Sequence, residues 1–183
     1  RSTPKPSSAA SDVYKRQVLA DQGKLDFSAP VAKYWPEFAQ KGKENILVSH
    51  IMSHSSGLPG WDEPVAGNDL YDPDKVAALF EMQEPWWEPG TALGYHAISI
   101  GNLMGEIIKR ISGKTVGKFF KDEIAVPLDI DFHIGLEDKH HSRVAEIHQA
   151  VESSPEDLFE LEEGSVMHKV MTNGIITAPD ANT

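Results

Sequence analysis

The segment from Pro85 to Ala97 constrains the fold of this chain more than any other part of the sequence. It holds two prolines, two glycines and two tryptophans in thirteen residues. Proline removes a backbone donor and glycine opens conformations closed to other residues, so this composition excludes a regular helix or strand. The segment must be a constrained loop, and it delivers Tyr95 to the start of the next element.

That next element is the clearest helix in the sequence. Its apolar residues recur at i, i+3, i+4, i+7, i+8 and i+11, which predicts an amphipathic helix from about Ser99 to Ile111 with one face in a core. The stripe consists of Ile100, Leu103, Met104, Ile107, Ile108 and Ile111. Gly113 follows at the position where a left-handed residue commonly ends a helix.

Other helix signals are shorter. Asp72 is a suitable N-cap and Pro73 suits the first helical position, which predicts a helix from Asp74 to about Met82. Its inward face is expected to hold Val76, Leu79 and Phe80. Thr115 is a second N-cap, for a helix whose inward residues are Val116, Phe119, Phe120 and Ile124. Further helical turns are expected before Gly23, within 46–52 and over 167–176.

Composition limits the possible functions. The chain has 183 residues, 40% of them hydrophobic, so it suits one globular domain or part of a larger one. Its net charge of −11, without any cluster of Lys and Arg, argues against binding to nucleic acid or anionic membranes. The absence of cysteine excludes disulfides, thiolate nucleophiles and cysteine-based zinc sites.

The first 17 residues differ in character from the rest. They are rich in Ser, Pro and Ala and lack periodicity, so we interpret 1–17 as a non-native or disordered leader and place the partial domain at 18–183. No apolar run approaches the roughly 20 residues of a membrane span. The N-terminal residues also lack the apolar region of a signal peptide. These features favour the cytoplasm, and export stays open if the natural N-terminus lies upstream.

Four blocks of sequence taken together resemble the serine β-lactamase-like superfamily, and within it class C β-lactamases and family VIII carboxylesterases. They are GKLDFSAPVAKYWPEF, ILVSHIMSHSSGLPG, PWWEPGTALGYHAISIGNLMGEIIKRISGK and FFKDEIAVPLDIDFHIGL. The resemblance covers Val18 to about Ala145. It implies an α/β (α+β) sandwich like that of penicillin-binding proteins, with an antiparallel sheet covered by helices and joined to a helical region. Because the blocks come mostly from that helical region, we expect this chain to be mainly helical with few strands.

The resemblance also implies catalytic residues. The family's Ser-x-x-Lys supplies a nucleophile, its Tyr-x-Asn contributes a general-base tyrosine, and its Lys/His-x-Gly strand helps to form an oxyanion hole. Tyr95-His96-Ala97 occupies the second position, which makes Tyr95 the candidate general base. Ala97 stands where the family has an amide side chain, which favours a small ester over a β-lactam. From its residues alone, Tyr95 is equally compatible with a core tyrosine that caps a helix.

The other two signatures are not convincing here. Ser2 and Lys5 match Ser-x-x-Lys by letter, but they lie upstream of the family register and no apolar helix follows them. No Lys/His-x-Gly strand follows Met167. We therefore expect the parent protein to be a serine hydrolase that forms an acyl-enzyme, and this chain alone to be inactive. Two alternatives stay open: a noncatalytic scaffold or binding protein with this fold, and a penicillin-binding D-Ala-D-Ala peptidase.

The remaining candidates surround the tyrosine. Trp86, Trp87 and His96 are expected to line a substrate pocket, although the tryptophans are also compatible with packing inside the loop. His50 and His54 have the i, i+4 spacing of a helical zinc site, but the usual third ligand and glutamate are absent, so we assign them structural roles. No metal or organic cofactor is implied. The expected partner is a small ester or amide substrate, and the oligomeric state is left open.

Overall fold

The computed structural model describes residues 17–145 and 162–175. A helical turn over 17–21 comes first and ends at Gly23, whose φ is +67°. The elements after it are η1 (Val31–Lys33), η2 (Pro36–Phe38), α2 (Val48–Met52), β1 (Val65–Ala66), η3 (Gly67–Tyr71), α3 (Pro73–Met82), α4 (Ser99–Ser112), α5 (Val116–Phe120), the π-helical turn η4 (Lys121–Ala125), η5 (Asp138–Arg143), α7 (Val166–Thr172) and β2 (Gly174–Ile175). The boundary expected after residue 17 falls at the edge of the described residues, so it stays a prediction.

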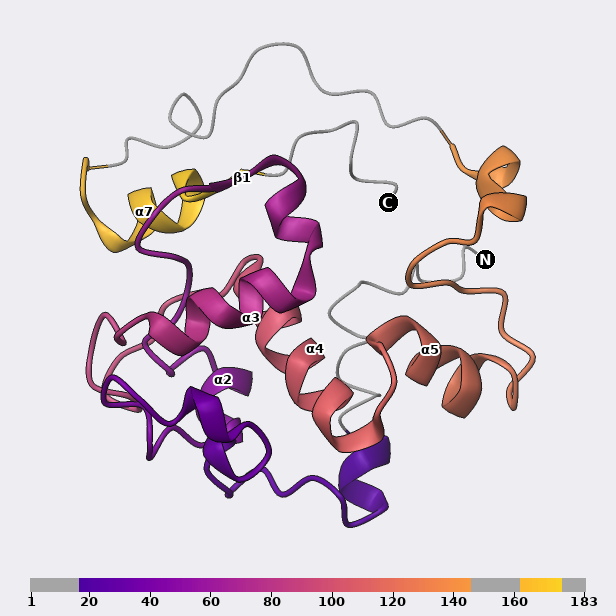
Figure 1. Ribbon diagram of the computed structural model, residues 1–183, viewed down its shortest axis with the longest axis horizontal. Coiled ribbons are helices and arrows are strands. Elements are labelled where there is room, and N and C mark those ends of the chain that lie inside the picture. The colour runs from indigo at the N-terminus through magenta and orange to yellow at the C-terminus, as the bar shows by residue number, and fades with distance from the viewer. Residues whose placement is uncertain (1–16, 146–161, 176–183) are drawn as a thin grey trace, which may run out of the picture.

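The described chain is about half helical, so the expectation of a mainly helical chain is met only in part. Its central helices α3 and α4 pack against each other, α2 lies against α4, and α5 follows α4 on the other side of the molecule (Figure 1). The two strands of the described ranges have two residues each and pair in parallel, with Val65 opposite Gly174. The expectation of few strands is therefore confirmed, while the antiparallel sheet of the parent fold does not lie in the described residues.

The helix α4 supplies one wall of the core. Its predicted stripe is buried at Leu103, Met104, Ile107 and Ile108, while the terminal members Ile100 and Ile111 are partly buried against the same cluster. The helix ends at Gly113 with φ +69°, the left-handed conformation that glycine adopts without steric cost. The periodicity of this segment therefore predicted both its buried face and its end.

The helix α3 begins as predicted but turns a different face inward. The Asp72 carboxylate accepts hydrogen bonds from the backbone N–H groups of Asp74 and Lys75, as an N-cap does. Val76 and Phe80 are buried, but the prediction for Leu79 is wrong because its side chain is 37% exposed. Ala77 is buried instead. Short apolar patterns allow two neighbouring faces, and packing of α3 against α4 and η2 selects the face with Ala77.

A buried lysine binds the carbonyl groups at the C-terminal end of α3. The side chain of Lys43 has no exposed surface, and its Nζ donates to the backbone carbonyls of Glu81 at 3.0 Å and Gln83 at 2.5 Å. The last carbonyls of a helix lack partners within the helix, so a cation there satisfies them and opposes the negative end of the helix dipole. Burial lowers the pKa of Lys43 to about 8.

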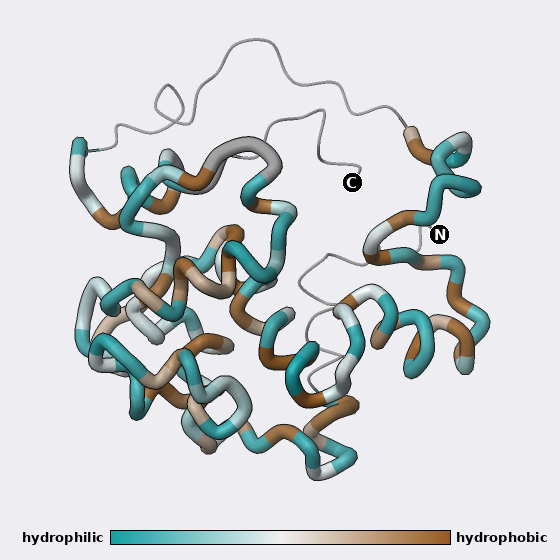
Figure 2. The backbone as a smooth tube through the Cα atoms, in the orientation of Figure 1, coloured by the Kyte–Doolittle hydropathy of each residue, from teal (hydrophilic) through white to brown (hydrophobic). Residues whose placement is uncertain are grey.

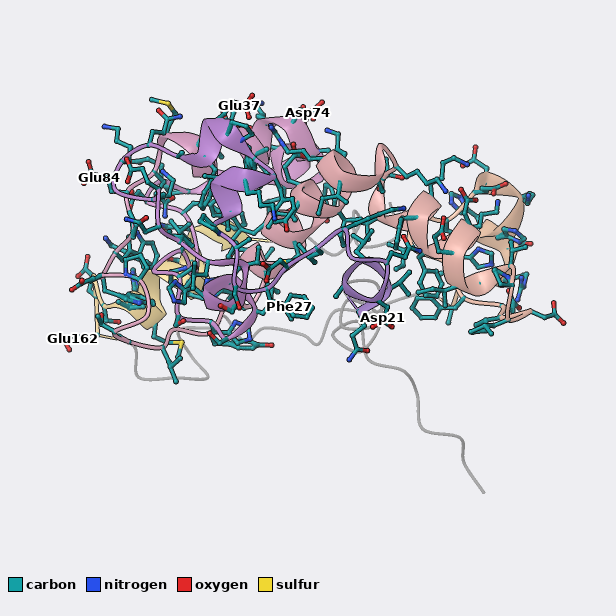
Figure 3. The ribbon with its side chains drawn as sticks, turned by 90° about the horizontal axis from the view of Figure 1, so that it is seen from below. Asp21, Phe27, Glu37, Asp74, Glu84 and Glu162 are labelled. Carbon is teal, nitrogen blue, oxygen red and sulfur yellow. The ribbon has the colours of Figure 1, made fainter. Side chains whose placement is uncertain are left out.

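The acidic excess lies on the outside. Glu37, Asp74, Glu84 and Glu162 project from the outline of the molecule (Figure 3). Hydrophobic and hydrophilic residues alternate along most of the tube, without a long hydrophobic stretch (Figure 2). In the part of the chain that the structure describes, no helix has the length and apolar character needed to cross a membrane.

Candidate active site around Tyr95

Two loops lie against each other at the N-terminal end of α4. We call residues 85–97 the tyrosine loop and residues 53–60 the serine–glycine loop. Three backbone hydrogen bonds join them: Trp86 N–H to the carbonyl of Gly57, Gly90 N–H to that of Ser55, and Gly94 N–H to that of His54, at 2.8 to 2.9 Å. These bonds satisfy backbone groups that an irregular loop would otherwise leave unpaired. The tyrosine loop is therefore an ordered support.

Two glycines allow this close approach. Gly57 has φ +79°, and a Cβ built on it would lie 2.7 Å from the carbonyl oxygen of Trp87. A Cβ on Gly94 would lie 2.3 Å from the Trp87 ring. No real side chain fits at such distances, so the two loops can pack this way only with glycine at both positions.

Tyr95 projects from this support. Its side chain is 67% exposed, and its ring packs on one side against the ring of His54, with centroids 5.0 Å apart. It lies just before α4, as predicted. The alternative of a core tyrosine is therefore excluded, because that would require the ring to be buried.

His96, the neighbour of Tyr95, points the other way. It has no exposed surface, its Nε2 lies 2.7 Å from the Ser56 hydroxyl, and its Nδ1 lies 2.7 Å from the carbonyl of Gly94. The carbonyl can only accept, so Nδ1 carries the proton and Nε2 accepts from Ser56. Burial lowers the pKa of His96 to about 4. A side chain that is enclosed and bonded at both nitrogens is not available to a substrate in this structure.

The two tryptophans support the loops. Trp86 donates from Nε1 to a carboxylate oxygen of Asp62 at 2.5 Å, and Lys169 of α7 places its ammonium 5.2 Å from the centre of the Trp86 ring. Trp87 packs beneath Gly94. These contacts favour the packing interpretation for both residues, and a role in a substrate pocket stays a prediction.

The remaining candidates fall into two groups. His50 lies within α2, whereas His54 follows the end of that helix with φ +61°, so the two do not share a helix face. The described residues contain no group of three His, Cys, Asp or Glu side chains that could hold a metal ion. Ser2 and Lys5 lie outside the described residues.

Comparison with known proteins places this arrangement in a family. A family model described as Beta-lactamase matches residues 17–180. The chain belongs to the β-lactamase family. Among curated proteins it is similar to the esterase/β-lactamase LipL of Mycobacterium tuberculosis, with 38% identity over 134 residues that make up 70% of this chain and 30% of that protein.

Solved structures of the β-lactamase family agree with the fold. A family VIII carboxylesterase is 42% identical with a TM-score of 0.74, and it matches 76% of this chain and 39% of its own. A penicillin-binding protein homologue from Caulobacter crescentus is 31% identical with a TM-score of 0.72, over 90% of this chain and 48% of its own. The chain therefore spans less than half the length of these relatives.

Sequence reasoning missed the pairing of Ser56 with His96. The two residues lie 40 positions apart, in loops without regular periodicity. It also missed Ser99, a buried residue at the start of α4 whose hydroxyl donates to the carbonyls of Leu58 and Pro59. The one hint of the Ser56–His96 contact in the sequence is that a serine and a histidine lie in two of the blocks that resemble the family.

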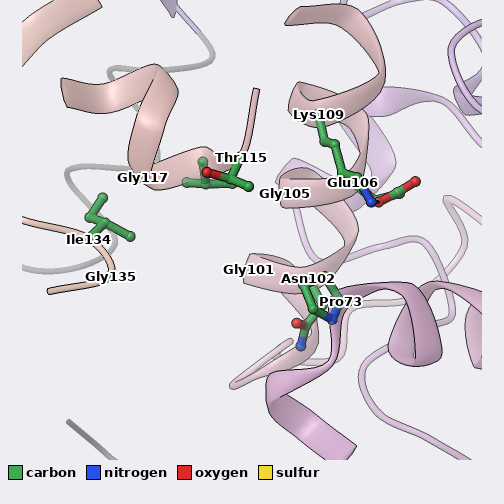
Figure 4. Close-up of a pocket in the computed structure, with 11 residues that line it drawn as sticks. Pro73, Gly101, Asn102, Gly105, Glu106, Lys109, Thr115, Gly117, Ile134 and Gly135 are labelled. Carbon is green, nitrogen blue, oxygen red and sulfur yellow. Dashed lines mark ion pairs between the residues drawn. The ribbon is translucent and has the colours of Figure 1, made fainter. Parts of the chain in front are cut away.

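A cavity of about 290 Å³ lies elsewhere, between α4 and α5 (Figure 4). Four of its eleven lining residues are glycines, Gly101, Gly105, Gly117 and Gly135, and Val116 and Ile134 are its larger apolar members. Glu106 also contributes, but its side chain points away from Gly117 and Ile134 in this view. Tyr95 is not among the lining residues, so this cavity is separate from the candidate active site.

Proposed function

We propose that the protein carrying this chain is a serine hydrolase that cleaves small carboxylic esters through an acyl-enzyme, with Tyr95 as the general base. The observation that carries the proposal is an exposed tyrosine held at the start of α4 by a hydrogen-bonded loop. The 42% identity to a family VIII carboxylesterase supports an ester substrate. Ala97 in place of the family's asparagine also favours an ester over a β-lactam.

The proposed reaction has two stages. A serine hydroxyl attacks the ester carbonyl while the Tyr95 phenolate accepts the serine proton and then delivers it to the departing alkoxide. Water then attacks the acyl-serine, and the carboxylic acid leaves. A phenol can act as a base near neutral pH only beside a cation, a part that the lysine of Ser-x-x-Lys plays in this proposal. No cofactor is required.

The test is the hydrolysis of p-nitrophenyl acetate and butyrate by the full-length protein and its Tyr95→Phe variant. General-base catalysis typically contributes a factor of about 10² to 10⁴, so we expect kcat to fall by at least about 100-fold. The substitution removes one oxygen from an exposed side chain, so the fold should be retained. Circular dichroism and thermal unfolding check this.

Tyr71→Phe is the matched control. Tyr71 is also an exposed tyrosine, 38% accessible, but it belongs to η3 and lies outside both loops. We expect turnover within about twofold of the wild type, because surface substitutions of this kind usually change the free energy of unfolding by only about 0.5 kcal/mol and this one lies in neither loop. Equal turnover by wild type and Tyr95→Phe would remove Tyr95 from the mechanism.

The second candidate is a penicillin-binding peptidase. It is supported by the match to the Caulobacter crescentus homologue, which extends over 90% of this chain. Fluorescent penicillin distinguishes the two: a peptidase of this type should be labelled and should release the label slowly, whereas an esterase should prefer the p-nitrophenyl esters. A protein labelled neither by penicillin nor by a fluorophosphonate would instead be a noncatalytic relative.

A further inference from the structure

We propose that Ser56 and His96 are positioning residues, a buried hydroxyl–imidazole pair that sets the orientation of Tyr95 from inside the tyrosine loop. The inference rests on the proposed function, because it assigns a purpose to the contact only if Tyr95 acts in the reaction. Neither side chain has exposed surface, so neither can touch a substrate directly. Their influence must pass through the backbone on either side of Tyr95.

The residues before and after Tyr95 are both anchored. Gly94 donates its N–H to the carbonyl of His54, and its own carbonyl accepts from Nδ1 of His96. His96 donates its N–H to Nδ1 of His54 at 3.1 Å, and its Nε2 accepts from Ser56. Tyr95 therefore lies between two fixed peptide groups while its side chain stays exposed.

Ser56 is the residue that joins the two loops in this arrangement. Its hydroxyl donates to Nε2 of His96 in the tyrosine loop, and the same oxygen accepts from the backbone N–H of Leu58 at 3.3 Å within the serine–glycine loop. When the Ser56 hydroxyl is removed, the buried Nε2 of His96 loses its hydrogen-bond partner and is left unsatisfied. The imidazole can then rotate, and with it the peptide that carries Tyr95.

A small displacement is enough to matter. Reacting groups must be held near an attack geometry, and a misplacement of about 1 Å can cost about 100-fold in rate. Loss of the Ser56–His96 hydrogen bond, which joins two neutral groups, loosens the position of Tyr95 without removing its hydroxyl. We therefore expect Ser56→Ala to lower kcat by about 10-fold and to leave KM within about twofold.

The decisive experiment is a double-mutant cycle in the full-length protein, with kcat on p-nitrophenyl acetate expressed per site titrated by a fluorophosphonate. Ser56→Ala should lower kcat in the wild-type background and cause no further loss in the Tyr95→Phe background. Ser56→Thr, which keeps the hydroxyl, should restore kcat to within about threefold of the wild type. Equal losses in both backgrounds, or unchanged kcat per titrated site, would overturn the inference.

Ser99→Ala is the matched control for the loss of a buried hydroxyl. The Ser99 hydroxyl donates to the carbonyls of Leu58 and Pro59 in the serine–glycine loop, rather than to a group of the tyrosine loop. We expect lower stability with kcat per titrated site unchanged. A drop in kcat as large as that of Ser56→Ala would mean that general loosening explains both, and would count against a positioning role.

Hydrogen–deuterium exchange of the full-length protein separates this inference from the proposed function. Ser56→Ala should speed exchange in peptides that cover 93–98, where the amides of Gly94 and His96 lie, and leave α3 unchanged. Unchanged exchange overturns the inference even if Tyr95→Phe is inactive. Full turnover by Tyr95→Phe overturns the proposed function, and the positioning role for Ser56 falls with it.

Discussion

Two pairs of neighbouring, mutually tilted histidine rings occur among the described residues, and their surroundings are opposite. The inner pair, His54 and His96, lies in the two loops of the candidate site with ring centroids 5.1 Å apart. The outer pair consists of His133 and of His140 in η5, with ring centroids 4.7 Å apart. His96 is fully buried and bonded to Ser56 and Gly94. The outer pair is surrounded by charges, and His133 contacts Asp131 at 3.1 Å.

The difference shows that ring contact alone does not define a histidine's role. Burial lowers the pKa of His96 to about 4, which keeps the ring neutral and its hydrogen bonds directional. The pKa of His140 is also lowered, by desolvation first and then by the positive charges of His133, Lys139 and Arg143. The inner pair therefore orders a loop, whereas the outer pair responds to charges that salt can screen.

The largest contrast is expected from glycine substitutions in the two regions. Gly57→Ala places a Cβ 2.7 Å from the Trp87 carbonyl oxygen at a positive φ, so the free energy of unfolding should fall by roughly 3 to 4 kcal/mol. Gly135→Ala has a similar φ of +72° but open space around the Cβ, so the loss should be about 1 kcal/mol. Urea unfolding of both variants measures the difference. Equal losses would show that the packed tyrosine and serine–glycine loops adjust to an added Cβ as easily as the surface at Gly135 does.

The second contrast is pH dependence. The folded pKa of His96, about 4, lies below the ordinary value of 6.5, so its neutral form stabilises the fold above pH 6.5. As pH falls from 6.5 to 4 the unfolded chain gains this proton first, and about 3 kcal/mol should be lost. Because carboxylates titrate in the same range, the measurement is the difference between wild type and His96→Asn.

His140→Asn is the reference for that pH series. The pKa of His140 is lowered too, so this variant should lose some of the acid-side dependence, but less than His96→Asn, whose imidazole is fully buried. If His96→Asn left the curve unchanged, the imidazole of His96 would have to be protonated, or solvated, in the folded protein. The inner and outer pairs would then be equivalent.

The smallest effect is expected at the outer pair itself. Asp131→Asn removes the carboxylate that contacts both His133 and Arg143, the latter at 3.3 Å between Nη1 and Oδ1. Exposed ion pairs contribute little and are screened by salt. At low ionic strength the melting temperature of the variant should differ slightly from that of the wild type. In roughly 0.5 M salt, where the Debye length is only a few ångströms, the two melting temperatures should be equal. A drop that persists in salt would indicate a structural role for the outer pair.

Several elements followed from local pattern. The helix α4 and its buried face, the Asp72 N-cap and the Gly113 end were all predictable, since each depends on residues within a few turns of one another. The inward face of α3 was predicted only in part, because Leu79 and Ala77 flank the buried Val76 and Phe80 on opposite sides and the packing partner decides which of the two is buried.

The C-terminal described segment was harder to predict. Residues 167–176 carried a helix signal, and α7 accounts for Val166–Thr172, but Gly174 and Ile175 form the strand β2. That strand exists because it pairs with β1, and Asn173 holds it there by donating to the carbonyl of Trp61, 112 residues away. A two-residue strand has no periodicity of its own, so no local sequence pattern predicts it.

The sequence by itself determined that a Pro- and Gly-bounded loop presents a tyrosine at the head of an amphipathic helix, because backbone restrictions and helical periodicity are local properties. The tertiary structure alone decided which of the adjacent residues Tyr95 and His96 faces solvent and which is buried against Ser56. In an irregular loop neighbouring side chains have no fixed alternation, so burial and hydrogen bonding depend on the second loop that packs against it.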